Sequence, residues 1–380
     1  MRVRLNPAVR MIPPSAVDGA RWTAEHLLER KRYTLSTPAA AMLVAACRPQ
    51  ELEELANGMT ERGGPSVEWF GLADSLYRRH LVVEVGEIDR DPRLAWLVTL
   101  RRDWSRFGWH EAVEYHALAF DYPCVDYSEG VAITTDRDRM RGYQVDEPDT
   151  DRFKTTYLDQ PGTPLPMPDR KMITTTARAL WTNNTNGRKT EFEQLGTALS
   201  LAFGVTGRLV PITDSAPLIR RSSPSGGGRN PSEGYVIVRD LAGIEPGVYH
   251  ITIEPFGLRR LDVPPLTADD LAEIFPETMR RFPFDTRALV VITSLFERNM
   301  YRYREPRTFR TVHMDAGHIA GALRIAARSL GLTAGIFYCD AADQVERVLG
   351  LDGMEEGYMV TVAVADGAGD TDAGGTAVSA

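Results

Sequence analysis

A loop at residues 219–233 is the stretch best suited to hold a ligand, and its sequence is IRRSSPSGGGRNPSE. Three consecutive glycines leave its backbone bare and free to adopt positive φ. Serine hydroxyls, three arginines and one asparagine supply donors for an anion or a polar heterocycle. The β-branched run at 234–239 follows directly and predicts a buried strand. The pattern predicts a ligand cradle ahead of a core strand, with a flexible Gly/Ser surface loop as the alternative.

A second chemical candidate is the pair His110 and His116, which lie six residues apart in an H-E-x-x-x-x-H pattern. Two zinc ligands on one helix face need a spacing of four, and a spacing of six directs them to different faces. The spacing therefore favours a structural role for both histidines over zinc ligation, and we expect no metal site.

Composition sets broad limits on function. The formal net charge of −8 argues against general nucleic-acid binding. Cys47, Cys124 and Cys339 are far apart, which suits a reducing cytoplasm. The N-terminus carries no apolar segment of signal-peptide length, and no later run has membrane length. We therefore expect a cytoplasmic protein without a nucleic-acid or membrane partner.

The N-terminal part, residues 1–165, is predicted to hold a winged-helix-like unit and a connection. Capping residues and apolar spacing indicate helices at 37–46, near 49–59 and from about 65, followed by a strand at 81–85. These helices are not rich in Lys or Arg, so peptide binding or scaffolding is favoured over DNA reading. The polar, Pro-rich stretch 136–170 predicts a meandering connection, whose opening run Asp136-Arg137-Asp138-Arg139 predicts a solvated face.

The second domain, residues 166–365, is predicted to be α/β (α+β), with a mixed sheet flanked by helices. The most regular helix is 310–330, where apolar residues recur at intervals of three and four. The Gly- and Ala-rich tail 366–380 lacks apolar anchors and is predicted to be disordered. The remaining predicted elements are helices at 190–203, 267–273 and 345–349 and strands at 234–239, 248–253, 288–294 and 358–364.

Four stretches in this domain, in order and spacing, resemble the SagB-type azoline dehydrogenases, a branch of the FMN-dependent nitroreductase superfamily. Residues 1–165 resemble more weakly the N-terminal part of a related group, the peptide-maturation dehydrogenases. The four stretches are SPSGGGRNPSE at 223–233, GVYH at 247–250, ERNMYRY at 297–303 with DAGH at 315–318, and GLTAG at 331–335 through LGLDG at 349–353.

The resemblance implies a homodimer that holds FMN at its interface with residues of both subunits. It also implies a substrate, a thiazoline or oxazoline ring in a ribosomally made precursor peptide, and possible partnership with other peptide-modifying enzymes. A base removes the proton at Cα while hydride leaves Cβ for the flavin. The implied cofactor-binding residues are Ser225, Gly226, Gly227, Arg229 and Asn230 of the loop and Thr333, Ala334 and Gly335.

Two positions depart from the family pattern. The family's Lys-Tyr pair near the substrate corresponds to Arg302 and Tyr303, and arginine, with a pKa above about 12, is a poor base. Either Tyr303, polarised by Arg302, takes the proton, or Arg302 only orients a peptide carbonyl; a solvated surface charge is the structural alternative. The phosphate motif R-R-S-x-R falls on 179–183, ALWTN, which leaves Arg178, Arg220 and Arg221 as substitutes.

The leading prediction is an FMN-dependent dehydrogenase that converts azolines to azoles in a modified peptide. Dehydrogenation or reduction of another Cα–Cβ bond of such a peptide is the nearest alternative, because the lysine is absent. Two further alternatives are a nitroreductase-like oxidoreductase, which uses NAD(P)H, and a scaffold protein without catalytic activity.

Overall fold

The computed structural model describes residues 1–15, 21–60, 66–122, 126, 128, 130–182, 190–210 and 217–367, with only the backbone at 60, 66–67 and 177–182. Most of the predicted tail therefore lies outside the described residues. The chain divides into two compact units, Met1–Cys124 and Val125–Ala380. Within the described ranges, none of the helices has the length and apolar character needed to cross a membrane.

The first unit contains two small antiparallel sheets and several helices. Its first helix begins as predicted, because the Ser36 hydroxyl accepts the Ala39 N–H and proline stands in the first turn. The three helices and the strand that the sequence predicted are present as α1, α2, α3 and β6, whereas strands β1 to β5 and helices α4 to α6 were not predicted. The winged-helix-like assignment and peptide binding remain predictions. The elements are β1 (Arg2–Leu5), β2 (Val9–Ile12), β3 (Trp22–His26), β4 (Lys31–Leu35), α1 (Thr37–Ala45), β5 (Gln50–Glu51), α2 (Leu52–Thr60), α3 (Ser66–Arg78), β6 (Val82–Glu84), α4 (Glu87–Arg90), α5 (Pro92–Ser105) and α6 (His110–Ala119).

The structure divides the chain between Cys124 and Val125 rather than near residue 165. The start of the predicted connection is a helix, α7 (Gly130–Asp146), with Asp136 and Met140 buried on one face. Further along, β7 (Gly162–Pro164) adds a strand to the edge of the main sheet beside β12. The alternating charges at 136–139 hid the helical face, so the prediction of an irregular, solvated connection was wrong for this part.

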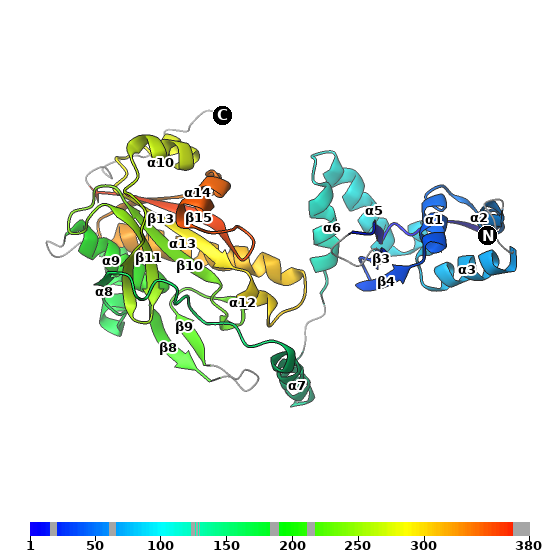
Figure 1. Ribbon diagram of the computed structural model, residues 1–380, viewed down its shortest axis with the longest axis horizontal. Helices are drawn as coiled ribbons and strands as arrows, with labels where there is room; N and C mark the ends of the chain where they lie inside the picture. The colour runs from blue at the N-terminus through cyan, green and yellow to red at the C-terminus, as the bar shows by residue number, and fades with distance from the viewer. Residues whose placement is uncertain are drawn as a thin grey trace. The chain divides into compact units, whose positions relative to one another are not determined.

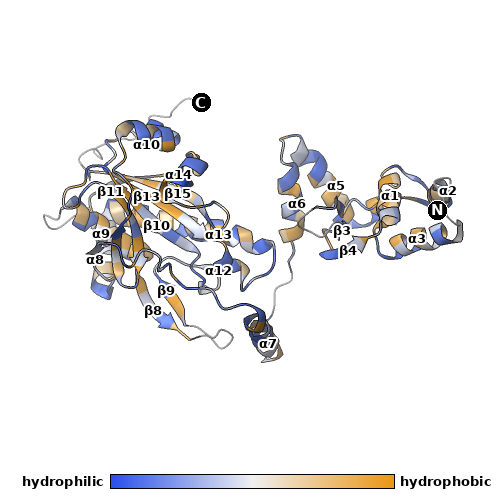
Figure 2. Cartoon of the chain, in the orientation of Figure 1, coloured by the Kyte–Doolittle hydropathy of each residue, from blue (hydrophilic) through white to orange (hydrophobic). Residues whose placement is uncertain are grey.

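A seven-stranded antiparallel sheet forms the centre of the second unit, in the order β14-β15-β13-β10-β11-β12-β7. Figure 1 labels its strands β10, β11, β13 and β15. Strand β10 is buried along its whole length, as predicted, and pairs with β11 and β13. The central strands are strongly hydrophobic (Figure 2). The strands not yet placed are β10 (Ser232–Val238), β11 (Gly247–Ile253), β12 (Phe256–Arg260), β13 (Ala288–Leu295), β14 (Thr333–Phe337) and β15 (Glu356–Ala365).

Helices cover both faces of this sheet. The long helix α13 (Arg307–Ser329) and α9 (Glu191–Phe203) pack with α8 (Arg170–Thr182) on one face, around Val236, Val290 and Val362. Helices α10 (Ala268–Ile274), α11 (Pro276–Arg281) and α14 (Ala342–Leu349) cover the other. Successive side chains of β10 point alternately into these two cores, as the side chains of a strand between two helical layers must. The predicted α+β class with a sheet flanked by helices is confirmed. The prediction of a mixed sheet was wrong, because every pairing of its described strands is antiparallel.

The glycine-rich loop lies at one end of this sheet. It follows the hairpin of β8 (Val205–Leu209) and β9 (Leu218–Arg221), forms a short 3₁₀ turn η1 (Gly226–Gly228) and leads into β10. At the same end, β13 runs into the short helix α12 (Glu297–Met300), which precedes α13. The glycine-rich loop therefore comes just before β10, and the Arg302-Tyr303 pair comes just after β13 and α12. Because β10 and β13 are neighbours in the sheet, the two stretches lie at the same end of it.

Candidate active site

Hydrogen bonds hold the glycine-rich loop in one shape. The carboxylate of Asp315, on α13, accepts from the Ser225 hydroxyl at 2.6 Å and from the Gly226 amide at 3.1 Å. The Ser225 oxygen in turn accepts the Asn230 amide at 2.8 Å. Burial raises the pKa of Asp315, and the bonds from Ser225 and Gly226 offset part of that rise. The loop is thus fixed to α13 and is not the flexible surface loop of the alternative interpretation.

Arg229 and Asn230 point into the protein. Arg229 has no exposed surface, and its Nε donates to the Arg298 carbonyl at 2.7 Å while Nη2 reaches Asp149 at 3.1 Å. The Asn230 amide donates to the carbonyls of Ile219 and Gly228, both at 2.9 Å. These two side chains, which the resemblance assigned to the cofactor, brace the loop in this structure. Direct contact with a flavin stays a prediction for them.

The structure brings the predicted catalytic tyrosine onto the predicted cofactor loop. Gly227 has a φ of 60° and is exposed, and a Cβ built on it would overlap the Tyr303 hydroxyl. A Cβ on Gly226 would likewise overlap the Thr311 side chain. At Gly227 both the positive φ and the close approach of Tyr303 favour glycine, whereas at Gly226 only the close approach of Thr311 does. Tyr303 is half-buried, so its hydroxyl lies at the edge of a bare stretch of backbone.

Substituting Gly227 tests this contact. We expect Gly227→Ala to lower kcat about tenfold or more, because Tyr303 must shift, and a shift of about 1 Å at a reacting group costs up to ~100-fold. The strain of a left-handed alanine costs a further 1–2 kcal/mol, approximately, of unfolding free energy. Gly350→Ala is the matched control: Gly350 has a φ of 68° with no atom within 4 Å of a built Cβ, so it carries the strain alone. Equal kcat in the two variants would contradict the contact.

Arg302 is not a solvated surface charge. Its side chain is 8% exposed and forms a two-pronged ion pair with Asp136 of α7, in which Nη1 donates to Oδ1 at 2.9 Å and Nη2 donates to Oδ2. The guanidinium carbon lies 5.1 Å from the centre of the Tyr303 ring, within range of a cation–π interaction. The structural alternative for Arg302 was therefore wrong, and so was the assignment of Asp136 to a solvated face.

The arginines proposed for the phosphate have different environments. Arg220 is exposed on β9. Arg221 is buried beside Glu233 and Arg298, and burial lowers its pKa to about 10. Its Nη1 donates to the Ser232 carbonyl at 3.3 Å, and Nε and Nη2 have no hydrogen-bond partner in the described part of the chain. Arg178 belongs to α8, but its side chain lies outside the described residues.

Thr333, Ala334 and Gly335 lie at the opposite end of the sheet from the loop. Thr333 pairs with Ala365 at the end of β15, beside the pairing of Ala288 with Val238, the last residue of β10. The loop joins β10 at its first residue, Ser232. The seven-residue strand β10 separates the two ends by about 20 Å at ~3.3 Å per residue. The Thr333 hydroxyl is buried and, among the described residues, has no hydrogen-bond partner. One subunit therefore does not bring the two predicted halves of the cofactor site together.

A buried polar network, which the sequence did not reveal, lies near the loop on the opposite face of the sheet from α13. Glu233 binds His250 at 2.9 Å and Arg298 at 2.6 Å, and both Glu233 and His250 are essentially inaccessible. Burial by itself would raise the pKa of Glu233, but the charge of Arg298 and the hydrogen bond of His250 outweigh it and leave the pKa far below its usual range.

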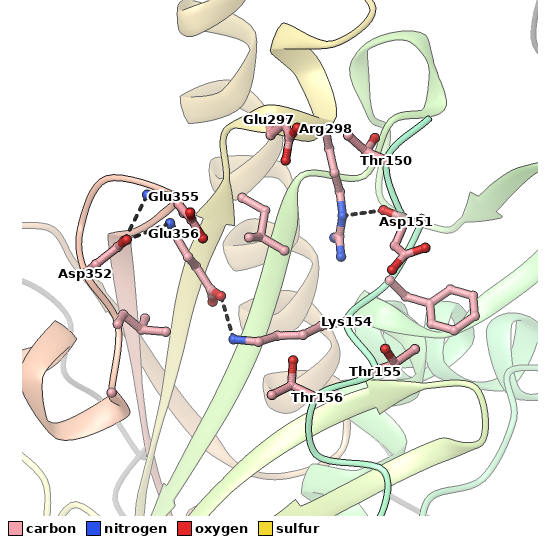
Figure 3. Close-up of a pocket in the computed structure, with 14 residues that line it drawn as sticks. Thr150, Asp151, Lys154, Thr155, Thr156, Glu297, Arg298, Asp352, Glu355 and Glu356 are labelled. Carbon is pink, nitrogen blue, oxygen red and sulfur yellow. Dashed lines mark hydrogen bonds and ion pairs between the residues drawn. The ribbon is translucent and has the colours of Figure 1, made fainter. Parts of the chain in front are cut away.

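A polar cavity of about 420 Å³ borders this network (Figure 3). Lys154 crosses it to the Glu356 carboxylate at 2.7 Å, and the Tyr235 hydroxyl donates to the other oxygen of Glu356 at 2.9 Å. Burial, followed by the negative charge of Glu356, raises the pKa of Tyr235. The Lys154 and Arg298 charges facing the cavity are thus already balanced by buried carboxylates. No short-range sequence pattern marks this network, because its members are far apart in the chain.

The residues present fit a flavin site divided between two ends of the sheet. The exposed backbone at Gly227 can face a flat ring, and the unpartnered Thr333 hydroxyl and exposed Arg220 can supply polar contacts. Tyr303 supplies an ionisable hydroxyl beside the first of these. A tyrosine can donate one proton as the phenol, or accept one as the phenolate, during a reaction.

Part of the chain is similar to known proteins. The family model described as "Nitroreductase family" matches residues 187–367. Over 145 residues the chain is 39% identical to the trifolitoxin-processing protein TfxB of Rhizobium leguminosarum, covering 37% of this chain and 38% of TfxB. Over 132 residues it is 32% identical to MJ1384 of Methanocaldococcus jannaschii, named as a nitroreductase, covering 34% of this chain and 64% of that protein.

The chain thus spans less than two thirds of either curated relative. A solved structure described as a nitroreductase from Anabaena variabilis has a TM-score of 0.44 and 20% identity, over 62% of this chain and 46% of that one. The family match includes the glycine-rich loop, the Arg302-Tyr303 pair and the strand that carries Thr333. Residues 187–367 form a nitroreductase-family domain.

Proposed function

We propose that the protein is an FMN-dependent dehydrogenase that acts on a modified precursor peptide, with oxidation of an azoline to an azole as the preferred reaction. The observation that carries the proposal is the packing of the Tyr303 hydroxyl against Gly227 of the glycine-rich loop. The family match supports FMN, and the similarity to TfxB, a protein named for processing trifolitoxin, supports a processing role. Bound FMN would supply the hydride acceptor of the reaction.

In this proposal Tyr303 moves the proton. In its phenolate form Tyr303 takes the proton from Cα of the substrate ring and becomes a neutral phenol. The hydrogen at Cβ leaves with its two electrons as hydride, for which bound FMN would be the acceptor, and a carbon–carbon double bond forms between Cα and Cβ. Arg302 does not take this role, because arginine keeps its proton and its two terminal nitrogens are held by Asp136. Between the two roles left open by the sequence, the ion pair favours Arg302 as the group that polarises Tyr303.

We further propose that two copies of the chain complete the site. The loop and the β14 residues lie at opposite ends of one sheet, so a cofactor that touches both must take them from different subunits. The outer face of α13 offers a surface for the second copy, since Gly317 and Gly321 have open space beside them and Met314 and Ile325 are more than half exposed.

Mixed dimers test the shared site. Gly227→Ala and Thr333→Val should each weaken FMN binding in the respective pure dimers, because one disturbs the loop and the other removes the unpartnered hydroxyl. A mixed dimer of the two variants then contains one site with both changes and one site with neither. Titration with FMN should show one tight and one weak site per mixed dimer. Two equally weakened sites would mean that each cofactor is bound by a single subunit.

The function itself is tested with purified protein. We expect the yellow absorbance of bound flavin after incubation with FMN, and mass spectrometry should show a loss of two hydrogens from an azoline-containing precursor peptide. A protein that stays colourless with FMN would overturn the dehydrogenase proposal.

Dehydrogenation of another Cα–Cβ bond in a modified peptide is the second candidate. The observation in its favour is that Arg302 stands at the position of the family's lysine. Because the lysine is a candidate base and arginine is not, another group must take the proton, and a different base suits a different C–H bond. Fragmentation of the product peptide distinguishes the two, because it locates the residue that lost the hydrogens.

A further inference from the structure

We propose that Asp136, on helix α7, is a positioning residue for Tyr303: it fixes Arg302, and Arg302 fixes the tyrosine ring against Gly227. The inference rests on the proposed role of Tyr303 in proton transfer and adds a residue to it that lies outside the nitroreductase-family match.

The first link is the ion pair. Asp136 is 3% exposed and meets Arg302 with both carboxylate oxygens, so that two parallel hydrogen bonds set the plane of the guanidinium. A pair of this kind is more directional than a single contact between a lysine and a carboxylate. Without the carboxylate, Arg302 would be an uncompensated cation in the interior, which is energetically costly. The ion pair therefore strongly favours this orientation of Arg302.

The second link is the stack on Tyr303. The Arg302 guanidinium carbon lies 5.1 Å from the tyrosine ring centre, and the ring ends in the hydroxyl that packs on Gly227. Because Gly227 has no side chain and a positive φ, the backbone stops the ring on one side while Arg302 holds its face. The tyrosine is therefore held between a fixed loop and a fixed cation.

Other contacts keep α7 in register with the segment that carries Tyr303. The Arg304 guanidinium lies 3.8 Å from the centre of the Tyr143 ring and pairs with Glu147 at 2.7 Å. The Tyr143 and Tyr301 rings meet edge to face, with their centres 6.4 Å apart. Asp136 is thus the first of several contacts along one side of α7, which makes the helix a fixed support and not a loosely attached linker.

The decisive variant is Asp136→Asn, which keeps the shape of the side chain and removes its charge. Asp138→Asn is the matched control, because Asp138 lies exposed on the same helix and, among the described residues, its ion pair is a surface contact with Arg141 at 3.8 Å. We expect Asp136→Asn to lower kcat about tenfold or more and to change KM less than about twofold, whereas Asp138→Asn changes neither. In a Tyr303→Phe background, Asp136→Asn should lower kcat by less than about twofold, since the group it positions is gone.

Hydrogen–deuterium exchange of the protein without flavin gives a readout independent of turnover. Peptides that cover Gly226 to Arg229 and Asn299 to Arg304 should exchange faster in Asp136→Asn than in Asp138→Asn. If Asp136→Asn does not fold, Asp136→Asn combined with Arg302→Gln removes both buried charges, and it should fold and show the same loss of kcat.

Two results would overturn the inference. One is a wild-type kcat in Asp136→Asn; the other is a loss of kcat that is undiminished in the Tyr303→Phe background, which would mean that Asp136 acts by another route. Wild-type protein that binds no FMN would instead overturn the proposed function, and the exchange measurement would still decide whether Asp136 holds Tyr303 on the loop.

Discussion

Tyr303→Phe should lower kcat by about 10² to 10⁴, the usual contribution of a positioned proton-transfer group. The substitution keeps the aromatic ring, so the stack under Arg302 and most of the packing on Gly227 remain. Only the hydroxyl that we place at the substrate's Cα is lost. The amount of flavin bound per subunit should therefore stay that of the wild type, measured by absorbance after removal of free FMN.

Tyr249→Phe is the control for this variant. Tyr249 is buried on β11 and its hydroxyl donates to the Glu245 carbonyl at 2.7 Å, so the change removes one hydrogen bond worth about 1 kcal/mol. It should lower stability slightly and leave kcat unchanged. Wild-type turnover by Tyr303→Phe would remove Tyr303 from the proton-transfer role and leave the reaction without an identified base.

Local patterns were sufficient to predict the main helices and strands of the second unit, but not elements such as α7, α8, β8, β9 and β12. The apolar spacing of α13 and the β-branched runs of β10 and β13 report burial directly, because each residue's neighbours in the sequence define its face. That Tyr303 and the loop belong to one site was implied by the resemblance and not by these patterns. Sequence spacing alone could not place two segments that lie far apart in the chain side by side.

The partners of the site residues could not be predicted, because they are contacts across long separations. Asp136 and Arg302 are 166 residues apart, and Lys154 and Glu356 are 202 apart. The run Asp-Arg-Asp-Arg at 136–139 has the composition of a solvated face, and only the packed structure shows that one of its four charges is buried. In the same way, Arg229 and Asn230 have the donors of ligand-binding residues, but their backbone positions direct those donors inward.

The network around Glu233 should be the most sensitive point for stability. Glu233 is buried and shares its carboxylate between Arg298 and His250, with Arg221 also nearby. Glu233→Gln keeps the shape but leaves two interior arginines without their shared anion, which should lower the unfolding free energy by about 3–5 kcal/mol. Urea unfolding at neutral pH measures this loss. Glu355→Gln, at an exposed glutamate, should change it by less than ~0.5 kcal/mol.

The pH dependence gives the same network a second test. Because the pKa of Glu233 is lowered in the folded protein, its stabilisation is complete above the ordinary carboxyl pKa of 4.5 and is lost as the pH falls below it. Between about pH 5 and pH 3 the unfolded chain binds a proton at Glu233 that the folded chain does not, so wild-type stability should fall with decreasing pH. The unfolding free energy of Glu233→Gln should fall less steeply over this pH range than that of Glu355→Gln. Parallel slopes would show that Glu233 titrates alike in both states, and the ion pair with Arg298 would then contribute nothing to the fold that holds the loop.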